Sequence, residues 1–200
     1  AITDRITEVI ALYSDEELFD VLSESGERTE TKKRRGDIHR DGDWHASVHI
    51  WVVRRRSGGM ECLLQKRADS KDSFPGCYDA ASTGHIDAGE DAISAAVREL
   101  EEELGVRARP SQLVLLFRRK VSEDNVFHGK RFINNEIKWV FLYRGALPET
   151  SINFELAEIS SVCWKDSAEI KKALEQHDKN WCIDLDEFRE VMHCAEDLVR

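Results

Sequence analysis

The chain has 200 residues, of which 41% are hydrophobic and 34% charged, and its formal net charge at pH 7 is −10. This composition is typical of a globular domain that is long enough to bury a core without covalent cross-links. The acidic excess disfavours a nucleic acid polymer as a partner, because the field of the whole molecule repels phosphate. No apolar run approaches the roughly 20 residues that cross a bilayer, so we expect no membrane partner. The first residues also lack the pattern of a secretion signal.

Five cysteines are scattered through the chain, and no two of them form a CxxC pair. This spacing favours reduced thiols that fill core space over a disulfide framework. We therefore expect a cytoplasmic protein. The cysteines are Cys62, Cys77, Cys163, Cys182 and Cys194.

The first part of the chain predicts one helix followed by strands. Residues 2–12 have the apolar spacing of a helix. Strands are predicted over residues 17–21 and 29–33, and the turn residues between them indicate a hairpin. A run of β-branched and aromatic residues predicts a buried strand over 46–54, and residues 61–66 return as another strand.

The second part of the chain mixes helices and strands. The clearest helix covers residues 91–104 and ends at Gly105, a residue suited to the left-handed position after a helix. Interleaved strands and helices, with no repeat or linker, predict one α/β layered domain. Further strands are predicted over residues 113–120, 137–143 and 160–164, and further helices over 168–176 and 186–199.

The helix over residues 91–104 carries an unusual group of carboxylates. At 100° per residue, Ile93, Val97, Leu100 and Leu104 form one stripe that we expect to face the core. The other face is expected to present Glu99, Glu102 and Glu103, whose i, i+3, i+4 spacing puts three like charges within one turn. Such a group is either a solvated acidic face or a binding site for a cation. The repulsion, close to the negative end of the helix dipole, favours Mg²⁺ or Mn²⁺ bound to hard oxygen ligands.

The surrounding residues resemble a known motif. Residues 84–106 read GHIDAGEDAISAAVRELEEELGV. This segment is similar to the Nudix box, Gly-x5-Glu-x7-Arg-Glu-aliphatic-x-Glu-Glu-x-Gly-aliphatic, and matches every defined position of it. The matching residues are Gly84, Glu90, Arg98, Glu99, Leu100, Glu102, Glu103, Gly105 and Val106.

The resemblance implies a fold and a chemistry. It implies an α/β/α sandwich with a mixed sheet, here a single domain over residues 1–200 with a core at about 35–165 and helical extensions at 1–16 and 165–200. It implies a Nudix hydrolase that uses Mg²⁺ or Mn²⁺ to split a diphosphate linkage in a small molecule. Dimers are frequent in this family, and the terminal helices offer surfaces for a homodimer.

The resemblance also implies roles for single residues. Metal binding falls to Glu99, Glu102 and Glu103, and Glu102 is the best candidate to orient or deprotonate the attacking water. Arg98 and Glu90 are expected to pair and hold the loop on the helix, which is a structural role. Backbone freedom at the two ends of the motif falls to Gly84 and Gly105.

The flanking segments resemble the branch of the family that includes isopentenyl-diphosphate isomerase. The similarity lies in residues 39–45, 63–67 and 71–76. In that enzyme the positions of Arg67 and Lys71 contact the substrate diphosphate. His45 and His85 match its metal ligands, and Glu136 matches its acidic residue, which makes Glu136 a weaker candidate for an additional acid or base.

Two departures from the isomerase matter. Thr83 occupies the position of its catalytic cysteine, and a hydroxyl is far too weakly acidic to replace a thiol. Asn134 replaces one of its metal carboxylates. With the complete box, these departures favour hydrolysis. An isomerase-like enzyme and a non-catalytic nucleotide-sensing module remain alternatives. Trp44, in a polar loop, is a candidate to stack on a base.

Overall fold

The computed structural model describes residues 17–71, 73–127, 129–147, 152–154 and 157–199. The helix predicted over residues 2–12, and with it the extension at 1–16, lies outside the described residues.

Strands in the described residues form one mixed sheet. They are β1 (Leu18–Leu22), β2 (Arg28–Arg34), β3 (Trp44–Arg56), β4 (Gly59–Arg67), β5 (Tyr78–Ala80), β6 (Ser82–His85), β7 (Leu113–Phe127), β8 (Lys130–Tyr143) and β9 (Ile159–Asp166). The helices are α2 (Arg35–Asp41), α3 (Ala92–Leu104), α4 (Ser167–Glu175) and α5 (Leu185–Leu198), with a short 3₁₀ turn at Pro110–Gln112.

Strand β3 is the centre of the sheet. It pairs antiparallel with β1, β4 and β6, and parallel with β8 from Trp44 opposite Asn135 to Trp51 opposite Leu142. The sheet is therefore mixed, as predicted. Because neighbouring residues of a strand point to opposite faces, β3 contributes to the packing on both sides of the sheet.

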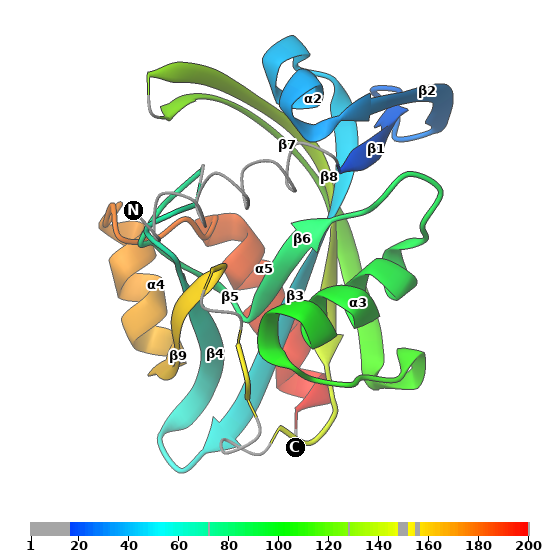
Figure 1. Cartoon of the computed structure of the whole chain (residues 1–200). Coiled ribbons are helices and arrows are strands. Elements are labelled where there is room, and N and C mark those ends of the chain that lie inside the picture. The colour runs from blue at the N-terminus through cyan, green and yellow to red at the C-terminus, as the bar shows by residue number, and fades with distance from the viewer. Residues whose placement is uncertain (1–16, 72, 128, 148–151, 155–156, 200) are drawn as a thin grey trace.

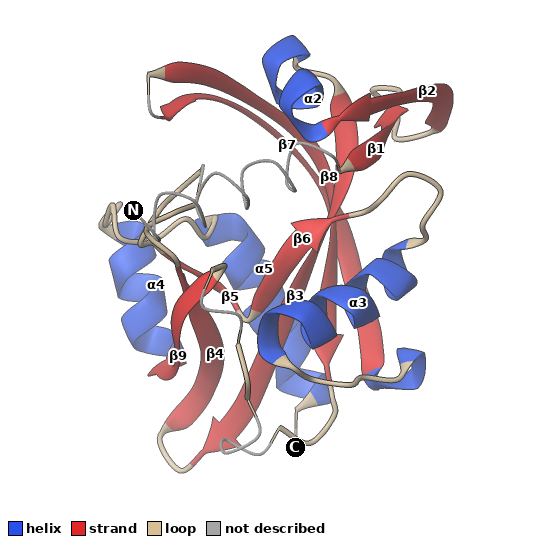
Figure 2. Cartoon of the chain, viewed as in Figure 1, coloured by secondary structure: helices blue, strands red, loops and turns tan. Residues whose placement is uncertain are grey.

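Helices cover both faces of the sheet (Figures 1 and 2). On one face Val48, Ile50 and Val52 of β3 pack with α3. On the other face Trp51 and Val53 pack with α4 and α5. The predicted α/β/α sandwich is confirmed, and so are the two helices near the C-terminus. No helix in the described ranges has both the length and the apolar character needed to cross a membrane.

The β7–β8 hairpin and helix α2 are two of the regions that differ from the sequence prediction. Strands β7 and β8 continue well past their predicted ends and pair as a long hairpin out to Phe127 opposite Lys130. The distal parts of these strands are polar and lack an apolar stripe. Helix α2 was not predicted, because its seven residues contain a glycine and offer Ile38 as their one aliphatic side chain. Burial of Ile38 and His39 stabilises it instead.

Candidate active site

Helix α3 is fixed at both ends by local features. Asp91 precedes it, and the Asp91 carboxylate accepts hydrogen bonds from the backbone N–H groups of Ile93 and Ser94. Gly105 follows it with φ of 66°, the left-handed conformation expected from the sequence. These caps set the start and end of the helix that carries the glutamates.

The three glutamates of α3 lie in different environments. Glu99 and Glu103 are buried, with 8% and 7% exposure, whereas the side chain of Glu102 is 56% exposed. The prediction that all three lie opposite the core is therefore wrong: the buried face is centred on Leu100 and includes Glu99 and Glu103 at its edges. Burial raises the pKa of both carboxyls, well above the usual range for Glu99 and to about 7 for Glu103.

Strand β6 receives the two buried carboxylates. A Cβ atom at Gly84 would lie 2.0 Å from Cδ of Glu99, so the glycine provides the space that this carboxylate fills. The Glu103 carboxylate accepts hydrogen bonds from the backbone N–H of Thr83 at 2.9 Å and from Nε2 of Gln65 at 3.2 Å. The positions of both carboxylates thus depend on the backbone of β6, and that of Glu103 also on the Gln65 side chain of β4.

Arg98 connects α3 to the loop before it. Its guanidinium donates to both carboxylate oxygens of Glu90, at 3.2 and 2.9 Å, and to the carbonyl of His85 at 3.0 Å. The expected contact between Arg98 and Glu90 is present. The same guanidinium also donates to Glu99 at 2.7 Å and to Glu102 at 3.1 Å, so it offsets part of their repulsion.

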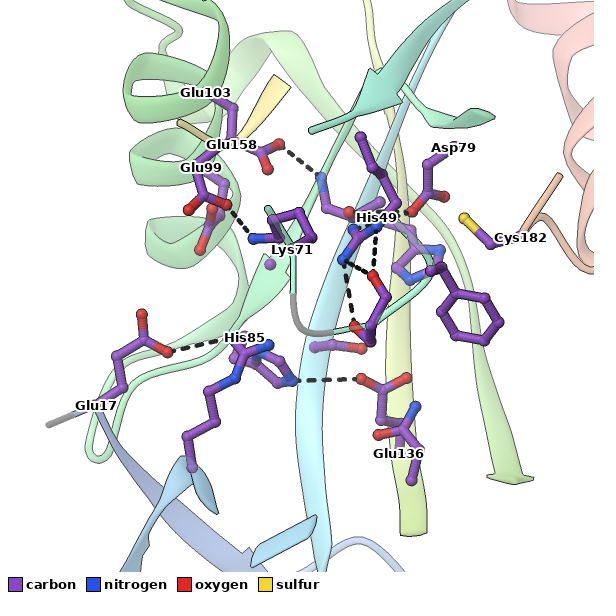
Figure 3. Close-up of a pocket in the computed structure, with 18 of the residues that line it drawn as sticks. Glu17, His49, Lys71, Asp79, His85, Glu99, Glu103, Glu136, Glu158 and Cys182 are labelled. Atoms are coloured by element: carbon purple, nitrogen blue, oxygen red, sulfur yellow. Dashed lines mark hydrogen bonds and ion pairs between the residues drawn. The ribbon is translucent and has the colours of Figure 1, made fainter. Parts of the chain in front are cut away.

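A cavity of about 650 Å³ brings the predicted site residues together. Figure 3 shows Glu99 and Glu103 projecting from α3 towards Lys71, and His85 directed at Glu136. Trp44 does not line this cavity; Nζ of Lys120 lies 4.3 Å from the centre of its ring. The cavity is lined by Arg67, Lys71, Gly84, His85, Arg98, Glu99, Glu102, Glu103 and Glu136, whereas Glu90 and Gly105 lie outside its lining.

The two predicted phosphate-binding cations are anchored at the cavity wall. The Arg67 guanidinium donates to the carbonyl of Ser73 at 3.0 Å and lies 3.6 Å from the Asp79 carboxylate. Lys71 pairs with Glu158. Each cation is thus positioned at the wall of the pocket by a neighbouring acid.

A cluster of three histidines lies at the other end of the cavity, where His39 and His85 belong to the lining and His45 does not. His39, His45 and His85 each offer one ligand atom, and these atoms all lie within 4.8 Å of one another. Among the described residues the three glutamates form no group as close as this. Each histidine Nε2 is buried and has no hydrogen-bond partner among the described residues.

Hydrogen bonds fix the tautomers of two of these rings. Nδ1 of His39 faces the Ile133 carbonyl at 3.3 Å, and Nδ1 of His45 faces the Asp43 carbonyl at 3.2 Å. A carbonyl can only accept, so each Nδ1 carries the proton and each Nε2 keeps a free lone pair. Burial, and then the neighbouring His45, lowers the pKa of His39 to about 3. The cluster therefore holds neutral imidazoles, the form that binds metals.

Glu136 joins the histidine cluster to the rest of the pocket. Its carboxylate lies 3.6 Å from Nε2 of His85, 3.8 Å from Nε2 of His45 and 3.9 Å from Nζ of Lys138. Burial raises the pKa of Glu136, but the neighbouring Lys138 ammonium outweighs it and keeps the pKa below its usual value. Glu136 is therefore an ionised carboxylate, suited to bind a cation or accept a proton.

Several residues of the pocket were missed by the sequence prediction. His39 begins the segment 39–45 that resembles the isomerase, but it was given no role there, and Glu158 comes from a segment without a recognisable local pattern. His49 and Lys138 lie in strands that read as apolar core. The alternation of His45, Ser47 and His49 along β3 was a usable signal, because a spacing of two places these side chains on one face of the strand.

Known proteins resemble this chain in both sequence and fold. The family described as NUDIX domain matches residues 43–185, which is more than half of the chain. The chain belongs to the Nudix family. The matched range contains every residue predicted to bind metal or phosphate.

Named relatives place the chain within this family. It is 39% identical over 165 residues to Nudix hydrolase 3 of Arabidopsis thaliana; the match covers 82% of this chain and 21% of that protein, so the chain spans about a fifth of that relative. It is 28% identical over 141 residues to an isopentenyl-diphosphate Delta-isomerase of Cereibacter sphaeroides, covering 70% of the chain and 74% of the isomerase. The crystal structure of DR0079 from Deinococcus radiodurans shares the fold, with a TM-score of 0.61 and 20% identity over 89% of the chain and 99% of that structure.

Proposed function

We propose that the chain is a Mg²⁺- or Mn²⁺-dependent hydrolase that splits the diphosphate linkage of a small molecule, X-diphosphate. The observation that carries the proposal is the pocket, in which the glutamates of the Nudix motif, Arg67 and Lys71 share one cavity. Membership of the Nudix family supports it.

The residues present fit divalent cations. Two buried carboxylates with raised pKa and three buried imidazole nitrogens without partners are groups that a cation would stabilise. We assign metal binding to Glu99, Glu102, Glu103 and His85. A bound cation supplies neutralisation of the diphosphate oxygens and a lower pKa for the attacking water.

The side chains of the pocket have separate roles in the proposed reaction. Glu102 is the exposed one of the three motif glutamates, so its carboxylate is the one with room to orient a water molecule and take its proton. Arg67 and Lys71 bind the phosphate oxygens, which bear more negative charge than the single carboxylates that hold these cations now. Glu136 acts as a further proton acceptor or ligand at the opposite end.

The test is a phosphate-release assay with Mg²⁺ or Mn²⁺ across nucleoside diphosphates, dinucleoside polyphosphates, nucleotide sugars and prenyl diphosphates. We expect Glu102→Gln to lower kcat by about 10²–10⁴-fold. Glu101→Gln is the matched control, because this exposed neighbour contacts Arg107 and lies outside the pocket lining. Equal turnover by Glu102→Gln and wild type would remove the role assigned to Glu102. No turnover of any substrate would favour a nucleotide-sensing module.

An isomerase remains the second candidate because the histidine cluster and Glu136 are complete. Against it, Thr83 offers its backbone N–H to Glu103 and no thiol to a substrate. The two functions separate in one assay: rearrangement of isopentenyl diphosphate without phosphate release identifies the isomerase.

The proposal extends to the domain organisation, the compartment and the oligomeric state of the enzyme. We propose a single Nudix domain that acts in the cytoplasm on a small-molecule substrate. The five unpaired cysteines support a reducing compartment. Self-association through the C-terminal helices is a further proposal, which light scattering at several protein concentrations tests.

A further inference from the structure

The floor of the pocket is formed by polar side chains that the proposed hydrolysis does not use. In the parallel pairing of β3 and β8, His45 lies opposite Glu136 and Ser47 lies opposite Lys138. His49 follows on the same face of β3. Ser47, His49 and Lys138 all line the cavity, so they form its next layer beyond the histidine cluster. Figure 3 shows His49 across the pocket from Glu99 and Glu103.

Two of these groups are buried, and in the described part of the chain one has no hydrogen-bond partner and the other is held only by two long ion pairs. Ser47 is 2% exposed, and its hydroxyl has no hydrogen-bond partner within the described ranges. Lys138 is 8% exposed, and its Nζ lies 3.9 Å from Glu136 and 4.0 Å from Glu187, both longer than hydrogen bonds. A buried hydroxyl and a buried ammonium are costly unless a ligand or water satisfies them.

Helix α5 orients the third group of the floor, the imidazole of His49. Glu187, 1% exposed, accepts hydrogen bonds from Nδ1 of His49 at 2.8 Å and from Nε1 of Trp51 at 3.2 Å. Because a carboxylate accepts, Nδ1 of His49 carries a proton. The floor therefore presents an ammonium donor, the imidazole of His49 and a hydroxyl that can donate or accept.

We propose that Ser47, His49 and Lys138 form a second subsite, which binds an uncharged hydrogen-bonding part of the group attached to the diphosphate. Glu187 is a positioning residue for His49. The proposal rests on the proposed hydrolase function, because it describes the substrate of that pocket.

The charges around the floor decide the chemical class of the ligand. Lys138 is surrounded by the carboxylates of Asp79, Glu123, Glu136 and Glu187, so a second anion gains little there. An apolar prenyl chain would offer no hydrogen bond to the Ser47 hydroxyl or to Nζ of Lys138. A ribose or a nucleobase edge, which carries donors and acceptors together, satisfies all three. The subsite thus favours a nucleoside over a prenyl group.

The test compares non-cleavable analogues by titration calorimetry, so that binding is read without turnover. The probes are α,β-methylene-ADP, its 2′,3′-dideoxy counterpart and the methylene diphosphonate of geraniol. We expect wild type to bind the adenosine probe at least about tenfold more tightly than the geranyl probe. A loss of affinity on removing the ribose hydroxyls assigns the subsite to ribose, and an unchanged affinity assigns it to the base.

Two variants connect that preference to the floor. Ser47→Ala removes a hydroxyl without a partner, so we expect an unchanged or higher Tm and a loss of about threefold to tenfold in affinity for the adenosine probe alone. Lys138→Met is expected to lose more. If Lys138→Met fails to fold because Glu136 and Glu187 lose their cation, Ser47→Ala decides. Ser111→Ala and Lys172→Met, both exposed and outside the pocket lining, are the controls.

Failure of the subsite and failure of the hydrolase are distinguishable. Equal or tighter binding of the geranyl probe, no binding of either probe, or an unchanged preference in Ser47→Ala and Lys138→Met overturns the subsite. A clear preference in calorimetry without cleavage of any diphosphate overturns the hydrolase and leaves the subsite standing.

Discussion

Burial acts on ionisable side chains at both ends of the pocket, but it shifts their pKa values in opposite directions. At the glutamate end, burial favours the protonated acid and raises the pKa of Glu99 and Glu103. At the histidine end, burial favours the neutral imidazole and lowers the pKa of His39 and His45. Both ends therefore disfavour their own charged side chains, and a bound cation would stabilise the ionised glutamates while using the neutral histidines as they are.

A change of pH is expected to give the largest difference in stability between the two ends of the pocket in the metal-free protein. The folded pKa of His39 is about 3 against 6.5 for an exposed histidine, so its contribution to stability is present above pH 6.5 and is lost as the pH falls towards 3. The full shift corresponds to roughly 5 kcal/mol. The folded pKa of Glu103 is about 7 against 4.5, so its contribution is present below pH 4.5 and is lost as the pH rises through 7. That shift corresponds to roughly 3 kcal/mol.

Urea unfolding in EDTA from pH 4 to pH 8 measures this contrast. We expect His39→Phe, which keeps an aromatic ring against Phe132, to lose less free energy of unfolding on acidification than wild type. Glu103→Gln should lose less on alkalisation between pH 4.5 and 8. Parallel profiles for all three proteins would contradict the proposed protonation states.

Gly84→Ala is expected to disturb only the glutamate end of the pocket. The added Cβ would lie 2.0 Å from Cδ of Glu99, so this carboxylate must move by more than an ångström. A misplacement of that size in an active site costs about 100-fold, which we expect in kcat/KM. Gly58→Ala is the matched control, because a Cβ there meets no atom within 4 Å. Full activity of Gly84→Ala would show that the position of Glu99 is not critical.

His85→Gln is expected to weaken the histidine end while sparing the glutamates. Imidazole ligands favour Zn²⁺ and Co²⁺ over Mg²⁺. Removing one of three such ligands should lower the affinity for Co²⁺ by at least about tenfold, read from its visible absorption. The control is His193→Gln, because this histidine is exposed on α5. Unchanged Co²⁺ spectra would exclude His85 as a ligand.

Trp44→Leu should have the smallest effect. Its ring contacts Lys120 and lies outside the pocket lining, so substrate binding does not depend on it. We expect a loss of about 0.5–1 kcal/mol in the free energy of unfolding and an unchanged KM. A rise in KM would restore Trp44 as a base-stacking residue.

The two ends also differ in how far the sequence predicts them. Caps, spacing and motif all lie within residues 84–106, so the helix and its glutamates were predicted together. The histidine end combines residues from α2, β3 and β6, which the chain order separates. Its members were predicted only where the isomerase resemblance supplied them, as for His45 and His85, and His39 was missed.

The sequence by itself determined the α/β class, the glycine that ends α3 and the identity of the acids that this helix carries, because these depend on neighbours within a few residues. Tertiary structure decided which of those acids are buried, since burial depends on how α3 packs against β6. It also decided that Ser47, His49 and Lys138 line one pocket and that Glu187 of α5 accepts a hydrogen bond from His49. Contacts between strands and helices distant in the chain carry no local pattern, so only the folded molecule brings these groups together.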